Sequence, residues 1–215
     1  MTTRSSQRAI LLMVTEEDGD QNYYMATEEH FSWPGGASGP TVGVGYDCGY
    51  STAAQILTDW TPFIGADRAA IVAKAAGIKG EVAHQYVEAN KNTITITWQE
   101  SLTQFNSQGL PLLEAEVEKA LPNTELLSGD SFGALASLTY NRGASFGLPG
   151  SRYSEMRNIK AHMEAKAFDL IPAEFLSMRR LWPPATSDLY KRRTHEALLF
   201  RDGLIPPTPT PAATT

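Results

Sequence analysis

Hydrophobic and polar positions repeat with the period of a helix over most of this chain. Apolar side chains recur every three or four residues, which is typical of amphipathic helices that turn one face to a core. Thr97 and Glu100 form a capping box, and Gly109 and Pro111 are expected to bend or interrupt the helix that it opens. The expected N-caps of two other helices are Ser51 and either Asp130 or Ser131. The predicted helices cover residues 6–17 (ending at Gly19), 51–60, 67–76, 80–90, 97–121, 131–140, 152–166, 171–181 and 186–201.

Residues 30–50 interrupt this pattern, because they are dense in glycine and proline. Within them, the segment from Thr41 to Asp47 alternates, which predicts a strand or tight hairpin with its apolar side on the core. The apolar face consists of Val42, Val44 and Tyr46. The opposite face consists of Thr41, Gly43, Gly45 and Asp47.

Two polar residues separated by two glycines would form a flat ledge that a ligand could approach closely. In a fully extended chain, positions 41 and 47 would lie about 20 Å apart, at roughly 3.3 Å per residue. Both can therefore act on one bond only if the chain bends at Gly43 or Gly45. The alternative is a glycine-rich hairpin that only needs room to turn.

These elements predict an α+β fold that is mostly α. The length of 215 residues favours one domain, which we expect over residues 1–205, and residues 206–215 read as a disordered tail rich in Pro, Thr and Ala.

Composition excludes several classes of protein. A hydrophobic share of 42% is ordinary for a globular protein. A net charge of −6 is not typical of proteins that bind nucleic acids or anionic membranes. The single cysteine, Cys48, allows no internal disulfide, and the four histidines have no metal-binding spacing, so we expect no metal and no cofactor. No signal peptide or membrane span is recognisable, so we expect a protein that is made in the cytoplasm and does not insert into membranes. We also expect a monomer.

Acidic residues crowd the end of the first predicted helix. Glu17 continues the apolar stripe of Ile10, Met13 and Val14, so its carboxyl group is expected to face inward. Partial desolvation favours the neutral, proton-donating form of a carboxyl group. Glu16 shares another stripe, so periodicity alone does not choose between the two, and a solvated acidic helix end is the alternative.

The order of these residues resembles a known family. Glu17 precedes Tyr24 by seven residues, and the stretch Ser38–Asp47 follows. This arrangement resembles the Glu, Tyr and Thr-x-Gly-x-Gly pattern of phage-type lysozymes (glycoside hydrolase family 24). It is closer to the pesticin-like branch, in which a Thr and an Asp six residues apart serve together. The stretches Trp33–Gly39 and Gly45–Tyr50 are similar to a group of lysozyme-like bacterial and phage proteins.

Two later stretches resemble the same family, and one position departs from it. Leu138–Gly143 is similar to the aromatic-Asn-x-Gly helix end that lines the lysozyme cleft, and Leu189–Phe200 is similar to the final RR-x-x-E helix. The best-known members carry an aspartate six residues before the threonine, where this chain has Gly35. The carboxylate role would therefore pass to Asp47. The fallback carboxylates are Glu28 and Glu29.

The resemblance implies a lysozyme-like fold, with a small β-hairpin region and a helical lobe, and a muramidase that cleaves bacterial peptidoglycan. Glu17 would be the general acid, and Asp47 with Thr41 would activate a water molecule and invert the anomeric centre. The expected substrate contacts are Tyr24, Trp33, Gly45, Tyr46, Asn141 and Arg142. Two routes to the wall stay open: holin-dependent release of a phage endolysin, or delivery of an antibacterial effector that an immunity protein restrains.

Three alternatives are kept. One is a catalytically inactive lysozyme fold that binds the wall, and another is a lytic transglycosylase that uses Glu17 only. The third is a serine hydrolase with the G-x-S-x-G motif at Ser145 followed by Asp169 and His195, but that motif requires a strand, a turn and a helix in a parallel sheet. Residues 131–142, which precede it, predict a helix instead.

Overall fold

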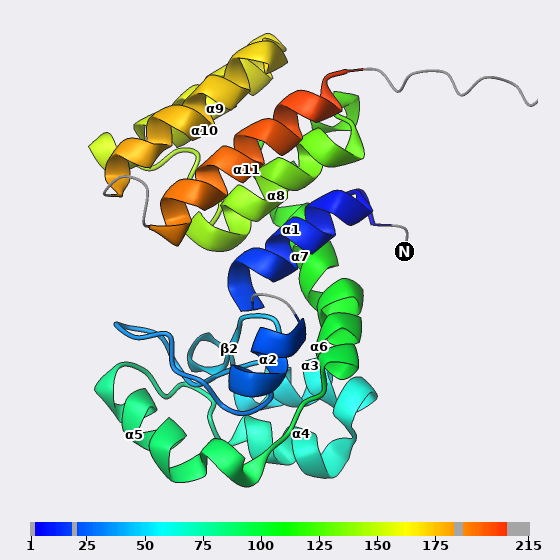
Figure 1. The fold of residues 1–215 in the computed structure, drawn as a ribbon, viewed down its shortest axis with the longest axis vertical. Helices are drawn as coiled ribbons and strands as arrows, with labels where there is room; N and C mark the ends of the chain where they lie inside the picture. Colours follow the sequence, from blue (N-terminus) through cyan, green and yellow to red (C-terminus); the bar gives the residue numbers. More distant parts are fainter. Residues whose placement is uncertain (1–2, 19–20, 183–186, 206–215) are drawn as a thin grey trace, which may run out of the picture. The chain divides into compact units, whose positions relative to one another are not determined.

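A computed structural model describes residues 3–18, 21–182 and 187–205 of the chain. The fold is α+β and mostly α, as the hydrophobic pattern predicted, and its small sheet has two antiparallel strands (Figure 1). The expected helix end at Gly19 and the predicted tail over residues 206–215 lie outside the described residues.

The chain divides into two compact units. Unit 1 comprises Met1–Met13 and Leu113–Thr215, and unit 2 comprises Val14–Leu112. The divisions fall inside α1 (Gln7–Asp18) and inside α7 (Leu110–Ala120). The expectation of one domain over residues 1–205 stays a prediction, and each unit is described by itself.

Unit 2 contains the hairpin and a set of short helices around one core. Trp60 is fully buried in this core, together with Phe31 and Ile56. Helix α2 was not predicted from the sequence. The elements of unit 2 after α1 are α2 (Gln21–Thr27), β1 (Thr41–Val42), β2 (Tyr46–Asp47), the 3-10 helix Cys48–Tyr50, α3 (Ala53–Ile64), α4 (Ala66–Ala73), α5 (Glu81–Asn90), the 3-10 helix Lys91–Thr93, α6 (Trp98–Gln104) and a π-helical turn (Phe105–Gly109).

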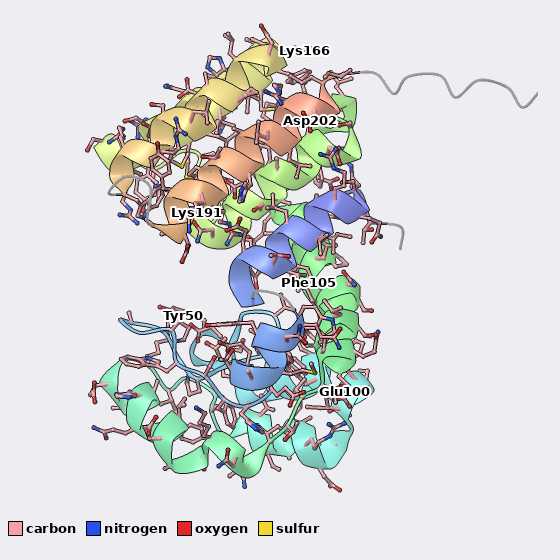
Figure 2. The ribbon with its side chains drawn as sticks, viewed as in Figure 1. Tyr50, Glu100, Phe105, Lys166, Lys191 and Asp202 are labelled. Atoms are coloured by element: carbon pink, nitrogen blue, oxygen red, sulfur yellow. The ribbon has the colours of Figure 1, made fainter. Side chains whose placement is uncertain are left out.

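Side-chain caps mark the starts of α3 and α6 in unit 2. The predicted capping box is confirmed, because the Thr97 hydroxyl accepts from the Glu100 amide N–H and the Glu100 carboxylate accepts from the Thr97 amide N–H. The Arg68 guanidinium also binds the Glu100 carboxylate, which is labelled in Figure 2. The predicted cap at Ser51 is wrong, because Thr52 takes this role by accepting from the Gln55 amide N–H.

The helix that begins at Trp98 is interrupted where Gly109 and Pro111 predicted a break. Its middle forms a π-helical turn over Phe105–Gly109, and α-helical geometry resumes at Leu110. A π turn contains one residue more than an α turn, so it shifts the helix face that follows. Accordingly, the buried positions step from Phe105 to Leu110 and then to Leu113.

The elements described in unit 1 are all helices, joined by turns and loops. Helix α8 packs along α11, and α10 packs against both α11 and α9 (Figure 1). Ser128 caps α8 by accepting from the Ser131 amide N–H, so the predicted cap at Asp130 or Ser131 is wrong by two or three residues. The elements of unit 1 after α7 are the 3-10 helix Thr124–Leu126, α8 (Gly129–Arg142), the 3-10 helix Ser151–Tyr153, α9 (Ser154–Ala165), the 3-10 helix Phe168–Leu170, α10 (Ile171–Met178), the 3-10 helix Arg179–Leu181 and α11 (Asp188–Gly203).

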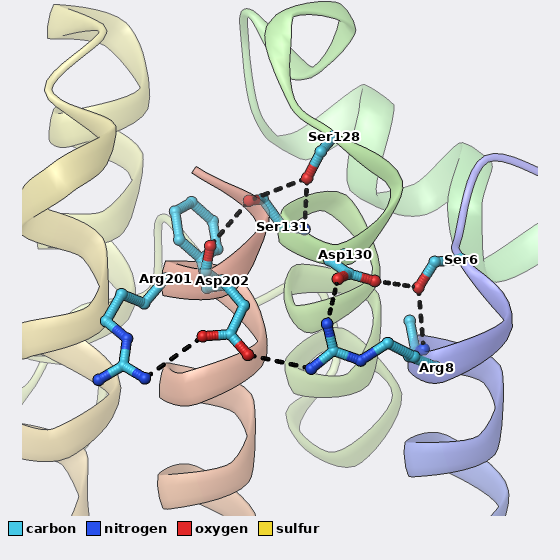
Figure 3. Close-up of polar contacts among 9 residues, drawn as sticks. Ser6, Arg8, Ser128, Asp130, Ser131, Arg201 and Asp202 are labelled. Atoms are coloured by element: carbon cyan, nitrogen blue, oxygen red, sulfur yellow. Dashed lines mark hydrogen bonds and ion pairs between the residues drawn. The ribbon is translucent and has the colours of Figure 1, made fainter. Parts of the chain in front are cut away.

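A polar network joins the start of α1 to α8 and α11 within unit 1 (Figure 3). The Arg8 guanidinium contacts the Asp130 carboxylate at 2.7 Å and the Asp202 carboxylate at 3.0 Å. The Ser131 hydroxyl donates to the Phe200 carbonyl oxygen at 2.8 Å. Because these contacts join segments far apart in the sequence, they hold the start of α1, α8 and α11 together in one unit. None of the helices in the described ranges is long and apolar enough to span a membrane.

Candidate active site

The hairpin in unit 2 brings Thr41 and Asp47 directly opposite each other. Thr41 pairs with Asp47 and Val42 pairs with Tyr46 in the antiparallel register. Cα atoms of opposed residues lie roughly 4.5 to 5.5 Å apart, and their side chains share one face. The chain reverses between them because Gly43 and Gly45 adopt φ values of 58° and 61°, a region that favours glycine. The bend predicted between the two residues is therefore confirmed.

The Asp47 carboxylate is engaged by backbone amides of its own loop. Its Oδ1 accepts from the Gly49 N–H at 2.8 Å and from the Gly39 N–H at 3.0 Å, while Oδ2 lies 3.1 Å from the same Gly39 nitrogen. Asp47 thus caps the 3-10 helix that follows it. Thr41 reaches the same peptide segment, because its hydroxyl donates to the Gly39 carbonyl oxygen at 3.3 Å. Both predicted catalytic side chains therefore meet at Gly39.

Close backbone approach explains two glycines of this loop. A Cβ atom on Gly39 would lie 2.4 Å from the Gly49 nitrogen, and a Cβ on Gly49 would lie 2.6 Å from the Ile78 carbonyl oxygen. Neither position has room for a side chain. The two glycines let the loop close tightly enough for one carboxylate to bind both of their amides.

The expected glycine ledge is wrong at Gly43. A Cβ atom there would lie 2.6 Å from the Trp60 ring and 3.0 Å from the Ser101 hydroxyl oxygen, so this glycine packs against the core instead of offering an open surface. Thr41 is also buried, with 6% of its surface exposed. Because the positive φ at Gly43 turns the backbone inward, the strand alternation of the sequence does not continue through the bend.

The third predicted catalytic residue, Glu17, belongs to the last turn of α1 and to unit 2. Its side chain is not among those that the structure describes. The neighbouring Glu16 is partly exposed. The fallback carboxylates Glu28 and Glu29 follow α2 and are both partly exposed.

The predicted aromatic contacts of unit 2 differ in their surroundings. Tyr24 is fully buried, and its hydroxyl donates to the Ile96 carbonyl oxygen at 2.9 Å. The expectation that it contacts substrate is therefore wrong, because its ring belongs to the core. Trp33 is partly exposed and stacks on the His84 ring with centroids 4.6 Å apart. Its indole N–H donates to the Ser38 carbonyl oxygen, at the start of the loop that carries Thr41.

Tyr46 is held by a buried acid that sequence reasoning did not identify. Its hydroxyl donates to the Asp59 Oδ2 at 2.7 Å, and the Gln55 side-chain amide donates to Oδ1 at 2.8 Å. Its ring packs edge-on against Trp60. Burial raises the pKa of Tyr46, and the hydrogen bond to Asp59 raises it further, so the phenol stays neutral and donates. Gly45, beside it, is partly exposed.

Comparison with protein families identifies the part of the chain that carries these residues. Residues 12–126 match the family described as Domain of unknown function (DUF8812). The chain belongs to this family. The DUF8812 region includes all of unit 2, and with it Glu17, Thr41 and Asp47. No curated protein matches the sequence.

The remaining predicted contacts, Asn141 and Arg142, lie after the DUF8812 region, at the end of α8 in unit 1. Both are partly exposed and line a pocket of about 190 Å³. Because the two units are described separately, these residues are assigned to unit 1 and not to the hairpin loop.

The stretch that resembles the RR-x-x-E helix forms a buried charge cluster on α11. Arg192, Arg193 and Glu196 are 2%, 0% and 0% exposed. The Glu196 carboxylate contacts Arg193 at 2.8 Å and Arg192 at 3.3 Å, and it accepts from the Ser137 hydroxyl on α8 at 2.7 Å. This cluster joins α11 to α8 and is structural.

The serine-hydrolase alternative lacks its required setting. Residues Gly129–Arg142, before the Ser145 motif, form helix α8, and the sheet in the described ranges is a two-stranded antiparallel hairpin. The Ser145 hydroxyl donates to the Arg142 carbonyl oxygen at 3.1 Å. Among the residues with described positions, no group of three or more His, Cys, Asp and Glu side chains could hold a metal ion.

Proposed function

We propose that this protein is a peptidoglycan hydrolase of the muramidase type, which cleaves the glycan strands of bacterial cell walls. The observation that carries the proposal is the pairing of Thr41 with Asp47 across the hairpin. These are the two residues that the resemblance to the pesticin-like lysozymes joins in one role. A hydroxyl and a carboxylate on one face of a tight turn suit the task of holding a water molecule.

Glycoside hydrolysis with inversion needs two groups. One protonates the leaving oxygen while the other removes a proton from the attacking water on the opposite face of the sugar. In this proposal Glu17 donates the first proton. Asp47 accepts the proton of the water, and Thr41 positions that water through its hydroxyl. The anomeric carbon gains the water oxygen as the bond to the leaving sugar breaks, so the product has a free reducing end.

The substrate contacts in this proposal come from partly exposed groups. Trp33 presents an aromatic ring near the loop, and the Gly45–Tyr46 segment lies at the turn itself. Asn141 and Arg142 belong to unit 1, and their role as substrate contacts stays a prediction. Sugar faces stack on aromatic rings, while N-acetyl and peptide groups need hydrogen-bond donors.

A lytic transglycosylase that uses Glu17 alone is the second candidate, and one observation favours it. Both oxygens of the Asp47 carboxylate lie within hydrogen-bond distance of backbone amides, which is the arrangement of a structural cap. If capping is its whole role, Glu17 would have to act without a second acid. The sugar's own hydroxyl would then displace the leaving group and form a 1,6-anhydro end.

Mass analysis of soluble fragments from purified sacculi tests the proposal and separates it from the second candidate. The hydrolase releases muropeptides with reducing ends, whereas the transglycosylase releases fragments that are lighter by one water molecule. Glu17→Gln should lose about 10²- to 10⁴-fold in rate, because the amide cannot donate the proton. Glu16→Gln is the matched control, since it removes the same charge one residue earlier, and it should keep most of the activity.

Three results bear on the assignment. Release of reducing fragments by the wild type, with loss in Glu17→Gln but not in Glu16→Gln, supports the muramidase. Anhydro fragments identify the transglycosylase. If wild type and Glu17→Gln both release nothing, neither enzyme assignment holds, and binding to sacculi without cleavage would then identify a wall-binding module.

A further inference from the structure

A small pocket at the end of α8 in unit 1 is lined by two arginines and two aromatic rings. Its volume is about 190 Å³. Arg142 comes from the last turn of α8, and Arg152 comes from the 3-10 helix that precedes α9. The full lining consists of Asn141, Arg142, Arg152, Tyr153, Trp182 and Leu189.

The Arg142 guanidinium is fixed in this pocket. Its Nη2 donates to the Arg152 carbonyl oxygen at 2.7 Å, and its Cζ lies 5.5 Å from the ring centroids of both Tyr153 and Trp182. Its other terminal nitrogen, Nη1, is buried and finds no acceptor among the residues that the structure describes. A buried donor without an acceptor is costly, so an acceptor oxygen of a ligand at this position would be favourable.

The carboxylate that acts on Arg142 is shared with another arginine. The nearby Glu155 carboxylate is already bound by Arg180 at 2.6 and 3.0 Å. Within the described ranges, no ion pair joins either Arg142 or Arg152 to a carboxylate. Burial lowers the pKa of Arg142 and the positive charges of Arg152 and Arg193 lower it further, while Tyr153 and Glu155 act in the opposite direction with smaller effect. The site would therefore gain from an anionic group, which would restore the balance of charge.

We propose that this pocket binds a carboxylate of the substrate, and that Arg142 and Arg152 recognise it together. A guanidinium matches the plane and spacing of a carboxylate, and two charge-assisted hydrogen bonds fix its orientation. The rings of Tyr153 and Trp182 would pack against the carbon skeleton next to that group. The carrier of the carboxylate is the peptide stem of peptidoglycan, and this part of the inference rests on the proposed function.

Titration of the full chain with a defined ligand tests the pocket without relying on catalysis. The probes are N-acetylmuramyl dipeptide with free carboxylates and the same compound with its carboxylates amidated. Binding is followed by the NMR signals of the Trp182 indole and the Arg142 side chain. We expect the free acid to bind at least about tenfold more tightly than the amide, as one charge-assisted pair contributes.

Substitutions in the pocket then test which residues cause the preference for the free acid over the amide. Arg142→Gln and Arg152→Gln should each remove most of the preference for the acid, and Arg142→Lys should restore little of it, because lysine does not bind in the same two-point manner. Lys119→Gln is the matched control, since Lys119 is an exposed cation on α7 of the same unit outside the pocket. Arg152 is exposed, so its substitution keeps the test valid even if Arg142→Gln fails to fold.

Equal affinity for acid and amide overturns the proposal, and so does an unchanged preference in Arg152→Gln. Displacement of the free acid by inorganic phosphate at equal concentration overturns the carboxylate assignment. The proposed function is tested separately. If sacculi yield no soluble fragments while the preference for the acid persists, the pocket binds carboxylates but the muramidase assignment is wrong. If sacculi are cleaved but acid and amide bind equally, the muramidase assignment holds and the carboxylate site is wrong.

Discussion

Replacing Asp47 by asparagine and by alanine is expected to separate the two tasks of this side chain. The carboxylate accepts from the amides of Gly39 and Gly49, and in the proposed mechanism it also accepts the proton of the attacking water. Asparagine keeps one carbonyl oxygen in the place of Oδ1, which accepts both amides. Alanine keeps no acceptor. The pair of variants therefore distinguishes a lost contact from a lost base.

The size of each effect follows from these contacts. Asp47→Ala leaves two amide groups without their acceptor, and each such loss costs about 1–3 kcal/mol when the group is buried. Because Asp47 is partly exposed, water replaces part of this, and we expect unfolding free energy to fall by about 2–4 kcal/mol, which includes the lost cap. Asp47→Asn should cost about 1 kcal/mol, since only the charge assistance is lost. Its hydrolysis rate should nevertheless fall about 10²- to 10⁴-fold.

Urea unfolding and muropeptide release measure the two quantities. With a denaturant slope of about 2 kcal/mol per molar urea, Asp47→Ala should lower the midpoint by about 1–2 M and Asp47→Asn by about 0.5 M. Activity is compared in the absence of urea, at a temperature at which both variants are folded. If Asp47→Asn released muropeptides at the wild-type rate, Asp47 would only close the loop. Equal midpoints for the two variants would refute the contact argument.

Three further predictions concern stability. Glu196→Gln should lower unfolding free energy by about 3–5 kcal/mol, because it removes the negative charge from a fully buried cluster, while the exposed Asp188→Asn should change urea midpoints little. Gly43→Ala should cost about 2–4 kcal/mol, since its Cβ meets Trp60 at a positive φ; a midpoint like that of the wild type would contradict this. The Arg68 hydrogen bond lowers the pKa of Glu100, so this stabilisation is present above about pH 4.5 and is lost as the pH falls through the folded-state pKa. Glu100→Gln should therefore weaken the dependence of the unfolding free energy on pH below about pH 4.5. An unchanged dependence would contradict this prediction.

Much of the helical framework could be predicted from periodicity and capping. The box at Thr97 and Glu100 and the break near Gly109 were both visible, because they depend on residues close in sequence. Helix α2 (Gln21–Thr27) was missed because it is only seven residues long and its apolar residues, Tyr23–Ala26, are consecutive instead of recurring at helical spacing. The pairing of Thr41 with Asp47 required a bend, and the glycines between them revealed where it falls.

The surroundings of the candidate site were less predictable. Nothing local indicates that Tyr24 is fully buried, or that Gly43 faces Trp60, because both depend on contacts with distant segments. The amide contacts of Asp47 are equally invisible, since Gly39 approaches Gly49 only in the folded loop. Strand alternation assumes a flat ribbon, and a turn this tight does not follow it.

The π-helical turn at Phe105–Gly109 has a consequence for related sequences. A π turn accommodates one residue more than an α turn, so a relative that lacks one residue in this segment could continue as a regular α-helix with the side chains of α7 on the same face. Its buried positions would then lie four residues apart where this chain spaces Phe105 and Leu110 five apart. Alignments of this family should therefore place a one-residue gap between positions 105 and 109, with the same hydrophobic pattern after Leu110.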